Sequence, residues 1–148
     1  MPSFVVPSAP DCPAHIFEQR VTYRMTDQMG FMYYGNYLEL FEIGRTELLR
    51  STGMTYRQME EDGFLLPVTQ AALDYRSPAR YDDLLEIHTR VAELSRARMT
   101  FHYEIRRSGE DAALCSGMTR HAAIDRTGRP RRLDERWREA LSALCPAV

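Results

Sequence analysis

Lysine is missing from this chain, and all 19 of its basic residues are arginine. Without a lysine amine, the protein cannot form a Schiff base through its own side chain or use lysine as a nucleophile. Any contact with phosphate falls to the planar guanidinium group of arginine, although a bias in genomic composition also accounts for this usage. The 21 acidic residues give a net charge of −2, so no basic excess is present to neutralise nucleic-acid phosphates. We expect no nucleic-acid partner.

Cysteine pairs and metal-ligand spacings are also missing. The three cysteines lie far apart, with no Cys-x-x-Cys pair: Cys12, Cys115 and Cys145. The four histidines show no His-x-x-x-His spacing: His15, His88, His102 and His121. This pattern is typical of a cytosolic protein rather than of a disulfide framework or a zinc site. We therefore expect a cytoplasmic protein with no metal.

Long hydrophobic runs do not occur, and no segment approaches the roughly 18 apolar residues that span a bilayer. Residues 1–13 contain four prolines but neither the basic start nor the continuous apolar run of a secretory signal. They are predicted to form a flexible N-terminal arm. The remaining residues, 14–148, have the length of a single domain.

The order of periodic segments predicts an α+β domain. Alternating apolar residues indicate a first strand from Phe17 to Tyr23, and helical spacing follows from Tyr37 to Ser51, with Gly53 as the stop signal. A short helix is expected over 55–61, and strands are expected over 65–75, 85–91, 99–105 and 112–125. A last helix is predicted over 133–144. One long helix followed by hairpin-linked strands favours an antiparallel sheet.

The segment before the long helix carries the chemical signal. Asp27 is in a turn-forming context, with Gly30 three residues later, and Asn36 with Glu39 resembles a capping box at the helix start. A carboxylate near unpaired helix-start amides can serve acyl transfer, because the amides polarise a carbonyl that the acid attacks or delivers water to. An ordinary Asx turn at Asp27 is the alternative.

A longer pattern resembles a known family. Asp27-x-x-Gly30-x-x-x-Tyr34-x-Asn36-Tyr37, followed by Glu42-x-x-Arg45, is similar to the signature of the 4-hydroxybenzoyl-CoA thioesterase family, including its YbgC-like acyl-CoA thioesterases. The likeness runs from about residue 17 to residue 144 and is most specific over 23–50. It implies the hotdog fold, a curved antiparallel sheet wrapped around one long central helix. It also implies a homodimer or a dimer-of-dimers tetramer, with sites between protomers.

The resemblance assigns roles to individual residues. Asp27 matches the catalytic carboxylate, as nucleophile or as general base, and the Tyr34 backbone N–H matches the donor to the thioester carbonyl. Many YbgC-like members carry histidine at this position, so Tyr34 keeps the main-chain donor but not an imidazole. Gly30 and Asn36 are expected to shape the substrate site. Met32, Tyr33 and Phe64 are further candidates for lining an acyl pocket.

Coenzyme A would be part of the substrate, and no separate cofactor is expected. Its phosphates call for cationic side chains. The resemblance places them in the turn between two strands, which holds Arg96 and Arg98, and Arg96 is the better match. A second cluster follows the last strand, and Arg132 is the expected phosphate contact within it: Arg129, Arg131 and Arg132. Solvated loops are the alternative for both clusters. The leading hypothesis is an acyl- or aroyl-CoA thioesterase. An acyl-carrier-protein thioesterase and a non-catalytic acyl-thioester binding or scaffold protein are the alternatives.

Other pairs of polar residues have a structural interpretation. Glu42 and Arg45, three positions apart on the helix, are interpreted as an ion pair. His102 and His121 lie on predicted strands and are interpreted as hydrogen-bonded histidines. A Cys115–His121 nucleophile pair has no supporting context in the sequence.

Overall fold

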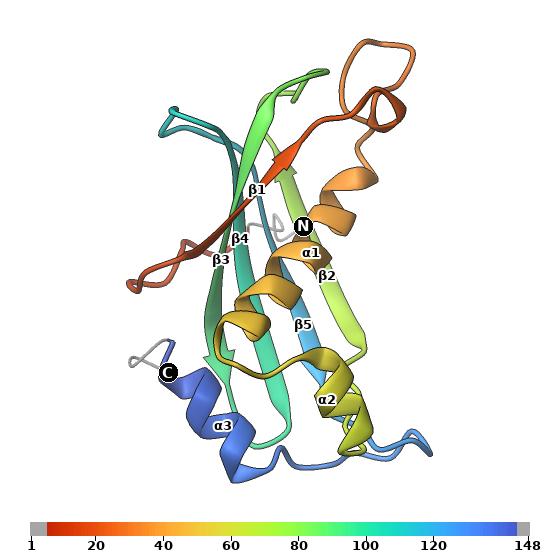
Figure 1. The fold of residues 1–148 in the computed structure, drawn as a ribbon, viewed down its shortest axis with the longest axis vertical. Helices are drawn as coiled ribbons and strands as arrows, with labels where there is room; N and C mark the ends of the chain where they lie inside the picture. The colour runs from red at the N-terminus through yellow and green to blue at the C-terminus, as the bar shows by residue number, and fades with distance from the viewer. Residues whose placement is uncertain (1–5, 145–148) are drawn as a thin grey trace, which may run out of the picture.

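The computed structural model describes residues 6–144 and contains one five-stranded antiparallel sheet with the order β1-β3-β4-β5-β2 (Figure 1). Its strands are β1 (His15–Arg20), β2 (Val68–Tyr75), β3 (Leu84–Leu94), β4 (Arg98–Arg107) and β5 (Ala113–Ala122). The helices are α1 (Asn36–Ser51), α2 (Tyr56–Glu61) and α3 (Glu135–Ser142), with a short 3-10 turn η1 (Tyr23–Met25). The predicted α+β class is confirmed. None of the helices between residues 6 and 144 is long and apolar enough to cross a membrane.

The long helix α1 lies across one face of the sheet (Figure 1). Its buried side is the one that the helical periodicity predicts, together with one more leucine: Tyr37, Leu40, Phe41, Gly44, Leu48 and Leu49. The ring of Phe41 stacks on Tyr103 of β4, with 4.3 Å between the ring centroids. Gly53 follows the helix with φ +84°, as the stop signal predicts.

Two glycines allow α1 to approach the sheet closely. A Cβ on Gly44 would lie 2.5 Å from Thr89 Oγ1 and 2.7 Å from Ile87 Cγ2, both on β3. A Cβ on Gly117 of β5 would overlap the Phe41 ring. The close approach fixes the height of the helix above the sheet, because neither contact has room for a side chain.

Several element ends differ from the prediction. β1 ends at Arg20, because Val21 exchanges backbone hydrogen bonds with Asp82 and Asp83 outside the ladder, and the chain then enters η1. β2 begins at Val68, just after Pro67, whose missing N–H cannot join a ladder. The expected strand over 112–125 is continuous from Ala113 to Ala122, and beyond it Ile124 forms isolated bridges with Leu65 and Pro130. Helix α3 is shorter at both ends than 133–144.

The predicted N-terminal arm is described from Val6 onward, and here it contacts the outer face of the sheet. Val6 packs with Ala72 and Met118. The Pro7 carbonyl accepts a hydrogen bond from His102 Nε2 at 3.0 Å, and the Cys12 carbonyl accepts one from Arg90 Nε at 2.8 Å. Residues from Val6 to Cys12 thus contact the sheet, whereas residues 1–5 of the predicted arm lie outside the described part of the chain. The flexibility of the arm stays a prediction.

The contact between α1 and β3 gives a stability prediction. Gly44→Ala should lower the free energy of unfolding by about 1–3 kcal/mol through overpacking, although alanine in a helix is favoured over glycine by about 1 kcal/mol. Chemical denaturation measures the change. Glu42→Ala, at an exposed position of the same helix, is the control. A Gly44→Ala protein as stable as the wild type would contradict the close approach.

Candidate active site

Asp27 lies in a tight turn that holds one of its two carboxylate oxygens. Oδ1 accepts hydrogen bonds from the backbone N–H groups of Met29 at 2.9 Å and Phe31 at 3.3 Å. The backbone closes the turn, with Asp27 N–H donating to the Phe31 carbonyl and Gly30 N–H to the Asp27 carbonyl. Gly30 has φ +82°, a left-handed conformation that glycine adopts without strain. Oδ2 has no hydrogen-bond partner among residues 6–144, and this oxygen is available to a ligand.

A second copy of the same turn occurs at Asp125. Its Oδ1 accepts from the N–H groups of Thr127 at 2.8 Å and Arg129 at 3.0 Å, and Gly128 has φ +86°. The backbone bonds that close the two turns are also the same. The Asx turn therefore describes the local structure of Asp27 correctly, and the turn alone does not make an active site. Its surroundings must supply the difference.

The first of these surroundings is the start of α1. The N–H groups of Tyr34 and Gly35 precede the helix, and neither has an acceptor within the described part of the chain. Unpaired amides at a helix start carry the positive end of the helix dipole. A carbonyl oxygen that gains negative charge is stabilised by such donors.

Asn36 does not cap the helix, so the predicted capping box is wrong. The N-cap position is Gly35, which already has helical angles (φ −66°, ψ −22°) and has no side chain that could accept a hydrogen bond from the first turn. Asn36 is the first helical residue, and its Nδ2 donates instead to the Met25 carbonyl at 2.9 Å. The same carbonyl accepts the Tyr33 N–H at 2.8 Å, so Asn36 ties the helix start to η1.

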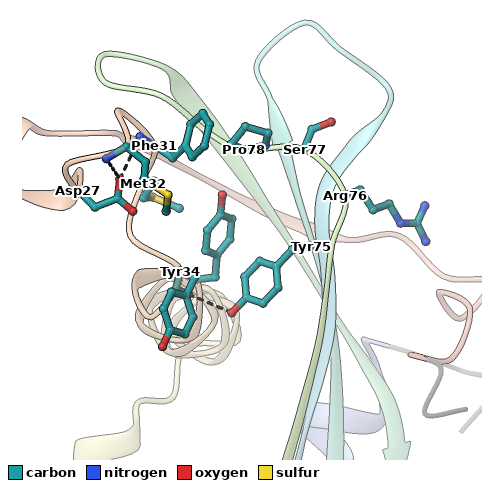
Figure 2. Close-up of a pocket in the computed structure, with 10 residues that line it drawn as sticks. Asp27, Phe31, Met32, Tyr34, Tyr75, Arg76, Ser77 and Pro78 are labelled. Atoms are coloured by element: carbon teal, nitrogen blue, oxygen red, sulfur yellow. Dashed lines mark hydrogen bonds between the residues drawn. The ribbon is translucent and has the colours of Figure 1, made fainter.

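A cavity of about 320 Å³ opens between the Asp27 turn, the start of α1 and the end of β2 (Figure 2). Figure 2 shows Asp27 and Tyr34 on the side of the turn and helix, with Tyr75 to Pro78 across from them. Most of the residues that line the cavity are apolar or aromatic. The full lining consists of Asp27, Met29, Phe31, Met32, Tyr34, Tyr37, Tyr75, Arg76, Ser77 and Pro78. The structure thus brings together Asp27 and Tyr34, the two residues predicted to be catalytic.

The lining differs in part from the sequence prediction. Met32 borders the cavity as expected, but Tyr33 does not, and Phe64 is buried in the core beneath the Arg131 guanidinium. The sequence prediction did not include residues 75–78 in the lining of the cavity. No local signal in the sequence marks these residues, because they reach the cavity only through the position of the end of β2 beside the helix start.

The predicted arginines lie elsewhere on the protomer and in two groups. Arg96 and Arg132 line a depression of about 380 Å³ with Arg138 and Glu135, beside α3. The Leu133 N–H donates to the Arg96 carbonyl at 2.8 Å, which holds the two loops together. Arg98 does not line this depression and instead borders another one with Arg120. The β3–β4 turn and the Asp27 loop lie at opposite ends of the molecule (Figure 1).

Comparisons with known proteins identify the family. A model of the thioesterase-like superfamily matches residues 21–142. The chain belongs to this superfamily. A putative esterase of Aquifex aeolicus is 36% identical over 109 residues, which cover 74% of this chain and 84% of the relative. The acyl-CoA thioesterase YbgC of Haemophilus influenzae is 38% identical over 93 residues, covering 62% and 68%. The structure of DHNA-CoA thioesterase from Staphylococcus aureus matches with a TM-score of 0.82 and 33% identity, covering 88% of this chain and 89% of that one.

These matches confirm the resemblance to YbgC-like thioesterases and the hotdog fold. The protein is a thioester hydrolase of this superfamily. Between residues 6 and 144 no group of three or more histidine, cysteine or acidic side chains is placed to hold a metal ion.

Other titratable groups of this thioesterase lie in the core. Tyr103 donates to Thr119 Oγ1 at 2.6 Å, Thr119 donates to His121 Nε2 at 2.8 Å, and His121 Nδ1 donates to the Leu66 carbonyl at 2.9 Å. Burial raises the pKa of the Cys115 thiol to about 12, so the thiol stays protonated and is a poor nucleophile. His121 is thus a hydrogen-bonded strand histidine, as predicted.

The predicted ion pair on α1 is wrong. No salt bridge joins Glu42 to Arg45 among the described residues. The charge of Arg45 lies instead near the buried hydroxyls of Tyr56 and Tyr103, where it partly offsets the rise that burial causes in their pKa values. Helical spacing predicts that two side chains are neighbours, but α2 and β4 bring the hydroxyls of Tyr56 and Tyr103 near Arg45 instead.

His121 gives a prediction on pH. Burial lowers its pKa to about 4, whereas the pKa in the unfolded chain is about 6.5. The unfolded chain therefore binds more protons between these pH values, so the stabilisation is complete above about pH 6.5 and is lost as the pH falls toward 4. His121→Gln, which does not titrate, should show a weaker fall in the free energy of unfolding between about pH 7 and pH 5.

Urea denaturation at several pH values measures both proteins. Burial also lowers the pKa of His102. This histidine is present in both proteins, so its contribution to the pH dependence cancels in the comparison. Parallel stability curves for wild type and variant would contradict the assignment of this pH dependence to His121.

Proposed function

We propose that this thioesterase hydrolyses acyl-CoA or aroyl-CoA to the free acid and coenzyme A at the cavity beside Asp27. The observation that carries the proposal is that Asp27 and Tyr34 border the same cavity. Within the described residues, Asp27 offers a carboxylate oxygen without a partner, and Tyr34 offers an amide N–H without an acceptor. The names of the relatives from Haemophilus influenzae and Staphylococcus aureus support a coenzyme A thioester as substrate.

The reaction follows from these groups. The thioester carbonyl oxygen accepts a hydrogen bond from the Tyr34 N–H, which stabilises the negative charge that develops on it. Asp27 Oδ2 either attacks the carbonyl carbon and forms a mixed anhydride that water then cleaves, or removes a proton from an attacking water. In both routes the C–S bond breaks, the thiolate takes a proton, and the acyl group gains the water oxygen. The bonds to Oδ1 keep the carboxylate oriented throughout.

Asp27→Asn tests the chemistry. Asparagine also forms Asx turns, so the fold should remain, while kcat falls by at least about a hundredfold because the nucleophile or base is lost. Asp125→Asn is a matched control, since it makes the same change in the same kind of turn outside the cavity. Steady-state hydrolysis of a series of acyl-CoA thioesters gives kcat for each protein. Turnover by Asp27→Asn close to that of Asp125→Asn would exclude Asp27 and favour a binding or scaffold protein.

The proposal includes a homodimer formed through β2. This strand is at the edge of the sheet, where its outer backbone groups face no other strand of the described chain, and Val68 and Tyr75 are exposed along it. An exposed edge of this length invites pairing with another strand. A twofold axis across β2 would extend the sheet into a second copy. It would bring the end of one protomer that carries the β3–β4 turn beside the end of the other that carries the Asp27 loop. A dimer of dimers stays a prediction.

This arrangement explains how the distant arginines can serve the site. The β3–β4 turn, which contains Arg96, lies at the end of the molecule opposite the turn before α1 (Figure 1). Arg132 lines the same depression as Arg96, so both would approach the cavity of the second copy. We propose that they bind coenzyme A phosphates there. Arg98 faces another depression and is the weaker candidate. The same arginines also suit the acidic surface of an acyl carrier protein, and comparing acyl-CoA with acyl-carrier-protein substrates separates the two.

The cytoplasm stays the predicted compartment.

Arg96→Ala and Arg132→Ala test this role. Each should raise KM for acyl-CoA more than it lowers kcat, because a distant phosphate contact contributes mainly uniform binding. Arg98→Ala is the control and should change KM less. An acyl-pantetheine thioester lacks the nucleotide phosphates, so all of these proteins should hydrolyse it alike. Unchanged KM values for acyl-CoA would remove the arginines from the site.

Mixed dimers test whether the site is shared. A dimer with Asp27→Asn in one copy and the two arginine substitutions in the other has one intact site if each site combines both copies. It should then show the wild-type KM and about half the wild-type kcat. If each copy held a complete site, the only active copy would carry the arginine substitutions, and KM would be raised.

A further inference from the structure

Tyr75 is joined to the start of α1 by a hydrogen bond from its side chain. Its hydroxyl donates to the Tyr34 carbonyl oxygen at 3.0 Å, and the dashed line between the two residues in Figure 2 marks this bond. Tyr75 is the last residue of β2, 41 positions away from Tyr34. The bond therefore connects the sheet edge with the turn that carries the proposed carbonyl-binding amide.

Neighbouring aromatic residues fix Tyr75 itself. Its ring meets the edge of the Tyr37 ring at a centroid distance of 5.2 Å and an interplanar angle of 83°. The Tyr37 hydroxyl accepts a hydrogen bond from the Ala79 N–H at 3.2 Å, which anchors that ring in turn. The side chain of Tyr75 is half exposed, and the partial burial of the rest raises its pKa, so the hydroxyl is protonated and able to donate at neutral pH.

The orientation of the amides follows from the planarity of the peptide bond. The Tyr34 carbonyl and the Gly35 N–H belong to one trans peptide, in which they point in opposite directions. The preceding peptide joins the Tyr33 carbonyl to the Tyr34 N–H, and its carbonyl accepts the Asn36 N–H at 2.9 Å. Both peptides that flank the Tyr34 Cα are thus held by their carbonyl oxygens, and neither N–H group has an acceptor among residues 6–144.

The hydroxyl of Tyr75 supplies the stronger restraint on the peptide between Tyr34 and Gly35. The Tyr34 carbonyl also accepts a hydrogen bond from the Tyr37 N–H, but the distance between nitrogen and oxygen is 3.4 Å. Bonds of that length are weak. A Cβ on Gly35 would lie 2.9 Å from the Tyr33 ring, so the turn is also tightly packed from the other side.

We propose that Tyr75 is a positioning residue for the hydrolysis, which holds the Tyr34 carbonyl so that the main-chain amides at the helix start keep the orientation that receives the thioester carbonyl. The inference rests on the proposed function, because it assigns the Tyr34 N–H to that carbonyl. Tyr75 acts through the main chain of Tyr34, and its ring lines the cavity independently of the hydroxyl.

Tyr75→Phe removes the hydroxyl and keeps the ring that lines the cavity. We expect kcat for acyl-CoA to fall about twofold to tenfold, the range for one lost neutral hydrogen bond, with KM changed less than about twofold because the bond acts on the transition state. Tyr81→Phe is the matched control: Tyr81 is exposed, its ring pairs with Tyr23, its hydroxyl has no partner among the described residues, and it lies outside the cavity lining. It should match the wild type.

A second measurement reports the peptide without relying on activity. The Tyr34 carbonyl carbon and the Gly35 amide nitrogen share the peptide that Tyr75 binds, so their NMR resonances should move in Tyr75→Phe and stay in place in Tyr81→Phe. Unmoved resonances would overturn the proposal, whatever the kinetics. Moved resonances with unchanged kcat would overturn its catalytic part, and a raised KM with unchanged kcat would place the hydroxyl on the substrate instead. A wild-type protein that hydrolyses no acyl-CoA would refute the proposed function and with it the catalytic role of Tyr75, while the resonances would still show whether Tyr75 holds the peptide.

Discussion

The close contact between α1 and the sheet is the constraint on which the site depends. Gly44 and Gly117 leave no room for a side chain between the helix and strands β3 and β5, and Phe41 stacks on Tyr103 in the same layer. These contacts fix the distance between the helix and the sheet. The first residues of the helix therefore lie beside the end of β2. The cavity lies in this corner, because the Asp27 turn covers one side and residues 75–78 cover the other. A shift of the helix would change the distance between the carboxylate and the helix-start amides at once.

The two Asx turns show how much of the chemistry comes from surroundings rather than from local structure. Asp27 and Asp125 bind the same backbone positions through Oδ1, and each turn has a glycine of positive φ three residues after the aspartate. The two backbones are interchangeable in their hydrogen bonds. Asp27 differs because its turn lies beside unpaired amides and an aromatic cavity, whereas Asp125 lies in an exposed turn after β5. A carboxylate held by one oxygen becomes useful for acyl transfer only where a donor for the carbonyl is also present.

The distribution of charge and of exposed edges agrees with a site that is completed by a second copy. Among the described residues, the cavity is lined by a carboxylate, aromatic side chains and one cationic residue, Arg76. Arg96, Arg132 and Arg138 gather at the far end of the molecule. The edge of β2 runs between these two ends (Figure 1). Tyr75 lies at the end of that edge and donates to the helix start, so in the proposed dimer the strand that joins the copies also supports the amides of the site.

The sequence by itself determined the elements and residues whose signals are local. The helical period predicted the buried side of α1 and alternation predicted the strands, because these features need only the geometry of a helix or a strand. The resemblance of the segment from Asp27 to Arg45 to a known family predicted the pair, Asp27 and Tyr34, that the structure brings to one cavity. Only the tertiary structure decided which groups far apart in the chain would meet. It gave Asn36 a carbonyl of η1 instead of a cap, separated Arg98 from Arg96, buried Phe64 and placed Tyr75 against Tyr34. Such contacts depend on how the helix and strands pack, and packing sums many weak interactions over the whole chain that no short pattern contains.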